Sequence, residues 1–110
     1  MLYISPSLVE KAGSGLAEPL SRARIGYRTV TRTATVTATS AAPGFPASAI
    51  RHPLTYERWA PTVAPATLSI DAGAPVTADY VGIAAHTIGS TGATVTVSYS
   101  VDGTTWTDVL

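Results

Sequence analysis

Threonine occupies every second position from Thr29 to Thr39, in the run RTVTRTATVTATS. The residues between the threonines are Val30, Arg32, Ala34, Val36 and Ala38. A period of two places alternate side chains on opposite faces of an extended chain, and β-branched residues pack well on a pleated surface. We therefore expect a strand here. Because Arg32 falls on its apolar face, the strand is expected at the edge of a sheet, where the guanidinium reaches water.

The remaining sequence also favours extended chain and turns over helix. Seventeen threonines stand beside nine glycines and eight prolines in 110 residues, and proline and glycine interrupt helical hydrogen bonding. This length suits one domain with a core of its own. A single all-β domain is therefore the expectation.

Two strands are expected in the middle of the chain. Residues 66–73 place Leu68 and Ile70 on one face of a short strand, which ends before a turn at residues 72–75. Residues 77–86 contain an unbroken apolar run with Gly82 inside it, which is typical of a central strand covered on both faces.

The last part of the chain predicts a hairpin. A glycine-rich turn at residues 88–94 leads into an alternating run at 94–101, which reads as a half-buried strand. Asp102 and Gly103 then predict a tight turn into a final strand, with Trp106 as its contact with the core.

Residues 43–61 interrupt this pattern of strands. The segment is rich in proline and holds most of the bulky apolar residues of the chain, so we expect a long loop whose large side chains fold beneath it. These residues are Phe45, Ile50, Leu54, Tyr56 and Trp59.

Composition argues against several classes of function. Charged residues are 13% of the chain and the formal net charge is zero, so no basic stripe is available for nucleic acid. The absence of cysteine removes disulfides and thiolate metal sites. No window approaches the roughly 18 apolar residues of a membrane span, so we expect no membrane insertion.

Three stretches, taken in order, carry a resemblance to a known family. They are APGFPASAIRHPLTYERWAP, ATLSIDAGAPVTADYVGIAAH and GATVTVSYSVDGTTWTDV. Together they resemble the discoidin-like domains, which are coagulation-factor C-type or galactose-binding-like β-sandwiches, in the form found in virion and tail proteins of tailed bacteriophages. The resemblance covers residues 28–110. It implies an all-β, antiparallel jelly-roll-type β-sandwich. Residues 1–27 lie outside it and show no sustained helical or alternating pattern, so we expect them to form an extended N-terminal arm.

Such sandwiches continue past the hairpin with further strands, whereas the present sequence stops at Leu110 soon after the Asp102-Gly103 turn. The resemblance therefore implies a sandwich that is incomplete in this chain. Two explanations remain open. The favoured one is a domain that continues beyond residue 110 in a longer polypeptide, and the other is a second chain that completes the sheet.

No arrangement of residues points to catalysis, a cofactor or a metal. His52 and His86 lie 34 residues apart without the spacing of a zinc site, and no G-x-S-x-G nucleophile elbow occurs. The resemblance suggests calcium in the loop before the anchor segment, but the equivalent stretch SAIRHPLT has no Asp or Asn. The carboxylates that could form a reacting pair are Glu57, Asp71, Asp79, Asp102 and Asp108. Asp102 is assigned to its turn, and Asp71 and Asp79 to strand ends, so no pair is placed for reaction. We expect no enzyme.

Tyr56, Arg58 and Trp59 are the candidate contact residues for a glycan or a protein partner, because aromatic planes and guanidinium groups serve such surfaces. The competing interpretation places Trp59 in the core and pairs Glu57 with Arg58 at its rim. His86 is a further candidate, either at a loop-end binding site or as a hydrogen-bonding group at the end of a strand.

Two functions follow from the resemblance. The first is a structural component of a phage virion, a tail or tail-tip (baseplate) protein that is assembled in the host cytoplasm and docks onto other tail proteins in a symmetric assembly. The second is a carbohydrate-binding module that recognises a glycan on the host surface. Low charge and an Ala/Thr-rich surface favour the first, because they suit permanent packing against other subunits.

Overall fold

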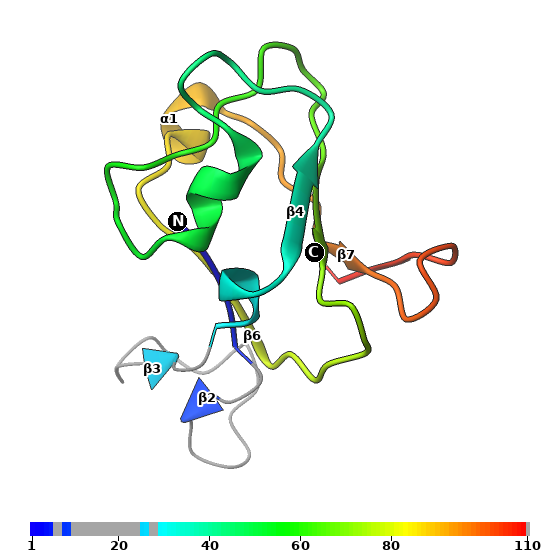
Figure 1. The fold of residues 1–110 in the computed structure, drawn as a ribbon. Coiled ribbons are helices and arrows are strands. Elements are labelled where there is room, and N and C mark those ends of the chain that lie inside the picture. The colour runs from blue at the N-terminus through cyan, green and yellow to red at the C-terminus, as the bar shows by residue number, and fades with distance from the viewer. Residues whose placement is uncertain (6–7, 10–24, 27–28, 110) are drawn as a thin grey trace.

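The computed structural model describes residues 1–5, 8–9, 25–26 and 29–109 (Figure 1). Most of the predicted N-terminal arm, residues 6–7, 10–24 and 27–28, lies outside the described residues. Short strands dominate, together with two 3₁₀ helices, η1 and η2, and one α-helical turn. The elements are β1 (Leu2–Ser5), β2 (Leu8–Val9), β3 (Ile25–Gly26), η1 (Val30–Arg32), β4 (Thr35–Ala38), η2 (Ala47–Arg51), β5 (Leu68–Asp71), β6 (Tyr80–Ile83), α1 (Ile88–Thr91), β7 (Ser98–Tyr99) and β8 (Thr107–Asp108).

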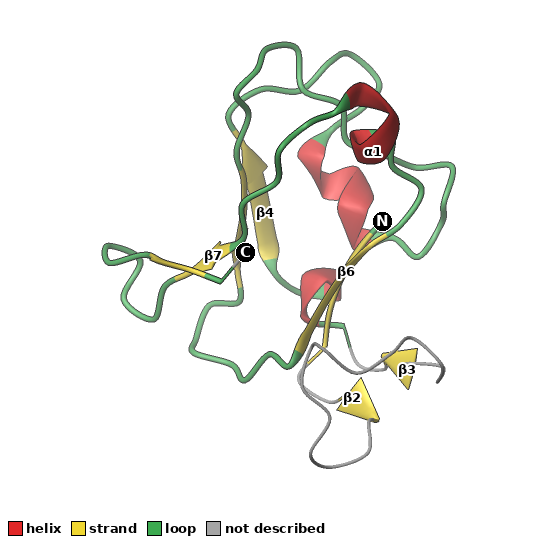
Figure 2. Cartoon of the chain, turned by 180° about the vertical axis from the view of Figure 1, so that it is seen from behind, coloured by secondary structure: helices red, strands yellow, loops and turns green. Residues whose placement is uncertain are grey.

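The described strands form four two-stranded antiparallel sheets, in the pairs β1–β6, β2–β3, β4–β5 and β7–β8. Because the described residues form antiparallel strand pairs and only short helices, the all-β class expected from the sequence is confirmed. Figure 2 shows the same arrangement from behind, with long loops joining the short elements.

The β4–β5 pair confirms two of the expected strands. Val36 lies opposite Ile70, and Ala38 lies opposite Leu68. Along each strand half-buried and exposed residues alternate, with the apolar side chains on the less exposed side. The alternating residues of the threonine run therefore form a strand, as expected, over Thr35–Ala38.

The first part of the threonine run is not a strand, which corrects the expectation for residues 29–34. Residues Val30–Arg32 form η1, and the backbone nitrogens of Thr33 and Ala34 both donate to the Val30 carbonyl, at 3.3 and 3.2 Å. The reason is a contact outside the run. Thr31 is only 1% exposed, and its Oγ1 donates to the carbonyl of Leu2 at 3.1 Å.

The core of the described chain is small and lies where η1, η2 and β4 meet. Its buried residues are Thr31, Ala34, Ala49 and Ile50. Ile50 is 6% exposed and is the largest apolar side chain among them. The loop at residues 43–61 therefore folds its isoleucine inward as expected, by means of η2.

β1 and β6 form the second long pair. Leu2 lies opposite Ile83, and the pairing extends to Met1 and Ala84, whose backbone N–H donates to the Met1 carbonyl at 2.9 Å. The first residues of the expected arm are thus extended and hydrogen-bonded to a strand of the same chain. Tyr80 lies across Gly82, because a β-carbon built at Gly82 would stand 2.8 Å from the tyrosine ring.

The expectation that β6 is covered on both faces is wrong. Val81 and Ile83 on one of its faces are 40% and 39% exposed. Among the described residues β1 is the only strand that pairs with β6, so β6 is not the central strand of a wider sheet there.

The glycine-rich stretch after β6 contains one helical turn, α1, where a plain turn was expected. Ser90 Oγ and Thr91 Oγ1 both donate to the Thr87 carbonyl, at 2.9 and 3.0 Å. Gly92 then ends the turn with a φ of 65°, a conformation that glycine adopts without steric cost.

The C-terminal hairpin projects from the rest of the molecule (Figures 1 and 2). Ser98 lies opposite Asp108, and the Val109 N–H donates to the Val97 carbonyl at 2.7 Å. The ordered strand is shorter than the expected 94–101. Trp106 is 57% exposed, so its predicted place in the core is wrong.

Candidate functional site

Trp59 fastens the loop that follows η2 to the segment after β4. Its indole Nε1 donates to the Ser40 carbonyl at 2.8 Å, and the Thr62 N–H donates to Ser40 Oγ at 3.2 Å. The indole is half-buried. The structural interpretation placed Trp59 in the core; the ring is instead half-buried and holds the loop in place through its hydrogen bond.

Arg58 and Tyr56 are both exposed on this loop. The guanidinium carbon of Arg58 lies 4.6 Å from the centre of the Phe45 ring, a distance at which a cation is attracted to the ring face. Tyr56 is 75% exposed, so its ring is free to stack on a ligand. The sequence expected Tyr56 to fold beneath the loop, and that expectation is wrong.

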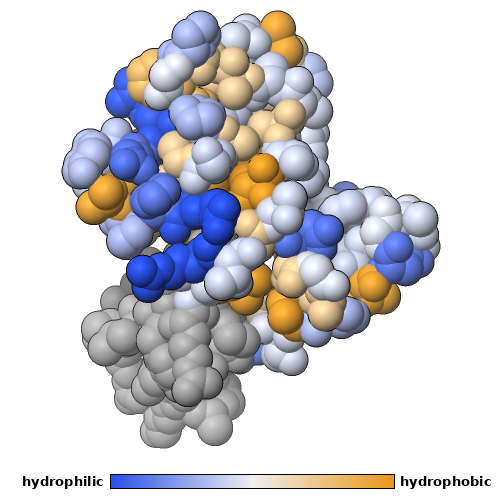
Figure 3. All heavy atoms as spheres, in the orientation of Figure 1, coloured by the Kyte–Doolittle hydropathy of each residue, from blue (hydrophilic) through white to orange (hydrophobic). Residues whose placement is uncertain are grey.

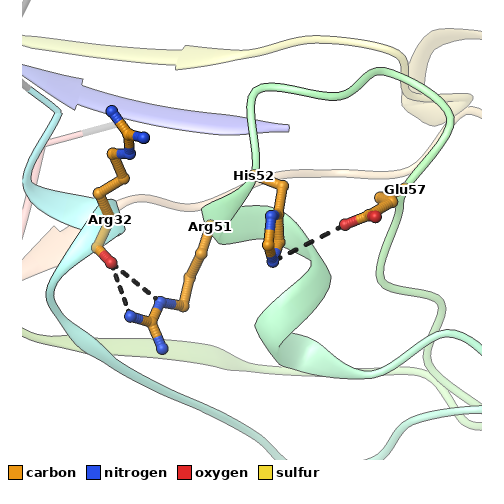
Figure 4. Close-up of polar contacts among 4 residues, drawn as sticks. All are labelled: Arg32, Arg51, His52 and Glu57. Atoms are coloured by element: carbon orange, nitrogen blue, oxygen red, sulfur yellow. Dashed lines mark hydrogen bonds and ion pairs between the residues drawn. The ribbon is translucent and has the colours of Figure 1, made fainter.

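The expected ion pair between Glu57 and Arg58 does not occur within the described chain. The Glu57 carboxylate instead lies 3.8 Å from Nε2 of His52, as Figure 4 shows. Both side chains are substantially exposed, so the pair contributes little to stability. The pair brings the polar groups of the His52 and Glu57 side chains together on the loop.

Arg51, the last residue of η2, joins η2 to η1. Its Nε and Nη2 both donate to the Arg32 carbonyl, at 3.2 and 2.6 Å (Figure 4). The Arg32 side chain itself extends away from this contact (Figure 4). The guanidinium of Arg51 is therefore held in place on η2, beside His52, while that of Arg32 is exposed on the neighbouring η1.

His86 lies apart from this group in the sequence and in its contacts. It is exposed and follows Ala85, whose φ of 55° is unusual for a residue with a side chain. No hydrogen bond or ion pair of the described residues joins His86 to Tyr56, Arg58 or Trp59.

The C-terminal hairpin presents a surface that the sequence analysis missed. Val97 and Tyr99 share one face with Thr107 and Val109, because these residues lie opposite one another in the register. Tyr99, Val101 and Val109 are 54%, 74% and 59% exposed. The signal was in the alternation at residues 94–101, which identifies an apolar face without showing what covers it.

The turn of this hairpin is held by one carboxylate. Asp102 Oδ1 accepts from the backbone N–H groups of Thr105 and Thr104, at 2.7 and 2.8 Å, and from the Ser100 hydroxyl at 2.9 Å. These donors hold the pKa of the Asp102 carboxyl well below its usual range. Gly103 follows with a φ of 74°, so the chain reverses at the predicted Asp-Gly pair. The turn is wider than the tight one expected, because residues 100–106 join β7 to β8 and the second strand begins at Thr107.

The described residues contain no group of three or more His, Asp or Glu side chains placed to hold a metal ion. None of the helices in the described ranges is long and apolar enough to cross a membrane. Comparison with protein-family models, with curated proteins and with solved structures found no match to this chain. Two exposed surfaces are the candidates for function: the loop that carries Tyr56 and the C-terminal hairpin.

Proposed function

We propose that the chain is a non-enzymatic structural component of a bacteriophage virion, a tail or tail-tip protein that docks onto neighbouring tail subunits. The observation that carries this proposal is the projecting hairpin with its uncovered apolar face. Tyr99, Val101 and Val109 remain largely exposed, although they share one face of the hairpin and such an apolar face is typical of a strand with one buried side. Apolar surface of this kind gains roughly 25 cal/mol per Å² when a partner covers it.

The small core supports the same proposal. Among the residues whose burial the structure describes, four are buried, and three of them are alanine or threonine. A fold with so little buried apolar surface gains stability from contact with other subunits, and permanent assemblies provide such contact. The resemblance to virion-type discoidin-like domains supplies the tail as the setting.

In this proposal residues 28–110 are a discoidin-like jelly-roll β-sandwich, and residues 1–27 are an arm that reaches a neighbour. The β4–β5 and β7–β8 pairs are then parts of the two layers, and β6 of the sandwich pairs with β1 of the arm. The protein is assembled in the host cytoplasm and resides in the virion.

Purified phage particles produced by a host that carries this sequence test the proposal. Mass spectrometry is expected to find the chain in the particles, and cross-linking is expected to join peptides from residues 97–109 to another tail protein. Cross-links from residues 75–79, an exposed loop of the same chain, serve as the control for random contacts. Absence of the chain from particles that contain every other tail protein would contradict the proposal.

Glycan recognition is a second candidate, favoured by Tyr56. Its ring is 75% exposed and lies one residue from the His52–Glu57 pair, which supplies polar groups beside a stacking plane. On a glycan array the chain is then expected to bind a host-surface sugar, and Tyr56→Ala is expected to abolish that binding. Tyr99→Ala, which removes a comparably exposed ring from the hairpin, is the matched control.

A further inference from the structure

Charges of opposite sign are segregated along the described chain. The described arginines are Arg32, Arg51 and Arg58, all on or near η1 and η2. Glu57 lies between Arg51 and Arg58 in the sequence, and its carboxylate is 3.8 Å from Nε2 of His52, which forms an ion pair with it when protonated. The other described carboxylates come later, and they are Asp71, Asp79, Asp102 and Asp108.

We name the region around η1 and η2 the basic surface. Its residues are Arg32, Arg51, His52, Leu54 and Tyr56. Arg32, Arg51 and His52 are adjacent within it, because Arg51 donates to the Arg32 carbonyl and His52 follows Arg51 directly. Neither arginine forms an ion pair with a carboxylate of the described residues. Leu54 and Tyr56 add exposed apolar surface beside these cations.

The second region is the acidic hairpin, residues 97–109. Asp102 holds its turn, and Asp108 accepts from Ser98 Oγ at 2.6 Å. Trp106 lies two residues before Asp108, so both side chains fall on the face opposite Tyr99. The hairpin thus offers an exposed aromatic ring and a negative charge on the same face.

These two regions cannot meet within one molecule. Figures 1 and 2 show the hairpin projecting on one side, and η2 with its following loop on the opposite side. The space-filling view in Figure 3 shows strongly hydrophilic residues over the body and a separate lobe at the side that carries apolar groups. Complementary surfaces on opposite sides of one chain are satisfied by a neighbouring copy.

We propose that the acidic hairpin of one copy binds the basic surface of a second copy, with Trp106 against Leu54 and Tyr56 and Asp108 facing Arg32. The contact is heterologous, so its repetition closes into a ring or extends into a filament. This inference rests on the proposed docking function and names its partner as a second copy of this chain. Opposite charges orient the encounter, and the aromatic contact supplies the attraction.

A symmetric contact between two hairpins is disfavoured by the same charges. Packing hairpin against hairpin brings Asp102 and Asp108 of both copies together, and like charges oppose association. The basic surface would then remain uncovered. The head-to-tail contact covers both regions at once.

Sedimentation of the full chain over a range of concentrations tests the proposal. The unchanged chain is expected to self-associate, more weakly as salt rises because charge pairs are screened. Arg32→Glu and Asp108→Arg alone are each expected to weaken association about tenfold or more, because each places like charges across the contact. An equimolar mixture of the two variants is expected to restore it, since every contact in the mixture can then join opposite charges.

Asp79→Arg is the matched control, because it makes the same charge change at an exposed residue outside both regions. It is expected to leave association unchanged. Trp106→Ser is expected to weaken association without altering any charge, which guards against misfolding of the Asp108 variant after loss of its bond with Ser98.

Three results would overturn the proposal: a chain that stays monomeric throughout, single variants that associate like the unchanged chain, or a mixture that fails to recover. If Asp108→Arg alone acts and Arg32→Glu does not, the contact is a different one. A monomeric chain that nevertheless cross-links to another tail protein in particles removes the second copy as partner and leaves the docking function intact.

Discussion

The unit of η1, β4, η2 and β5 differs from the C-terminal hairpin in how each is held together. In the first, side chains far apart in sequence are joined, as when Arg51 donates to the Arg32 carbonyl and Trp59 to that of Ser40. In the hairpin every side-chain hydrogen bond among the described residues is local, within ten positions. The hairpin therefore has a fixed turn but contributes no residue to the buried core of the described chain.

The largest loss of stability is expected from a substitution at Ile50, in the unit of η1, β4, η2 and β5. Ile50→Ala leaves a cavity beside η1 and β4, so the free energy of unfolding is expected to fall by about 2–5 kcal/mol. Urea denaturation followed by circular dichroism measures it. If the loss is below about 1 kcal/mol, the described core does not hold the fold.

Thr31 is the next test, because it is buried through a polar contact. Thr31→Val keeps the shape but leaves the Leu2 carbonyl without its donor, so we expect a loss of about 1–3 kcal/mol in unfolding free energy. Thr33→Val is the matched control, since Thr33 is exposed and its Oγ1 lies 3.5 Å from the Val30 carbonyl. Equal losses in both variants would contradict the role of burial.

Asp102 tests whether the hairpin turn is independent of the packed unit. Its carboxyl pKa is lower when the turn is formed than in the unfolded chain, so its stabilisation is present above the ordinary carboxyl value of about 3.9 and is lost as pH falls below it. NMR is expected to show the Thr104 and Thr105 amide signals moving in this acidic range. Asp102→Asn is expected to alter the same signals at neutral pH while leaving those of η2 unchanged.

The smallest effect is expected at Val101. Its side chain is 74% exposed, so Val101→Ser is expected to change the unfolding free energy by no more than about 0.5 kcal/mol. Urea denaturation at protein concentrations below self-association measures this. A loss as large as that of Ile50→Ala would show that the hairpin is already packed, and the comparison would fail.

Sequence reasoning predicted the features that depend on local chemistry. The strands at residues 35–38 and 68–71 and the Asp102-Gly103 turn follow from a period of two and from turn preferences, which neighbouring residues decide. The positions of the contact residues were predicted less well. Trp59 was considered for the core and is half-buried, and Tyr56 was expected beneath the loop and is exposed. Their contact with a glycan or a partner stays a prediction.

The failures occur where a distant contact decides. Thr31 sits within an ideal alternation, yet a carbonyl 29 positions earlier draws it into η1. Trp106 and Ile83 have the pattern of buried residues, but burial requires an opposing layer, and a pattern within one strand carries no information about that layer. For this reason the uncovered hairpin could be recognised only from the three-dimensional arrangement.

The chain's two tryptophans give each region its own optical signal. Trp59 is fastened to the Ser40 carbonyl within the packed unit, whereas Trp106 stands largely in water on the hairpin. Unfolding moves the emission of the first indole to longer wavelength, and association moves that of the second to shorter wavelength. Loss of structure and gain of a neighbour therefore change the intrinsic fluorescence in opposite directions, and no added dye is needed to tell them apart.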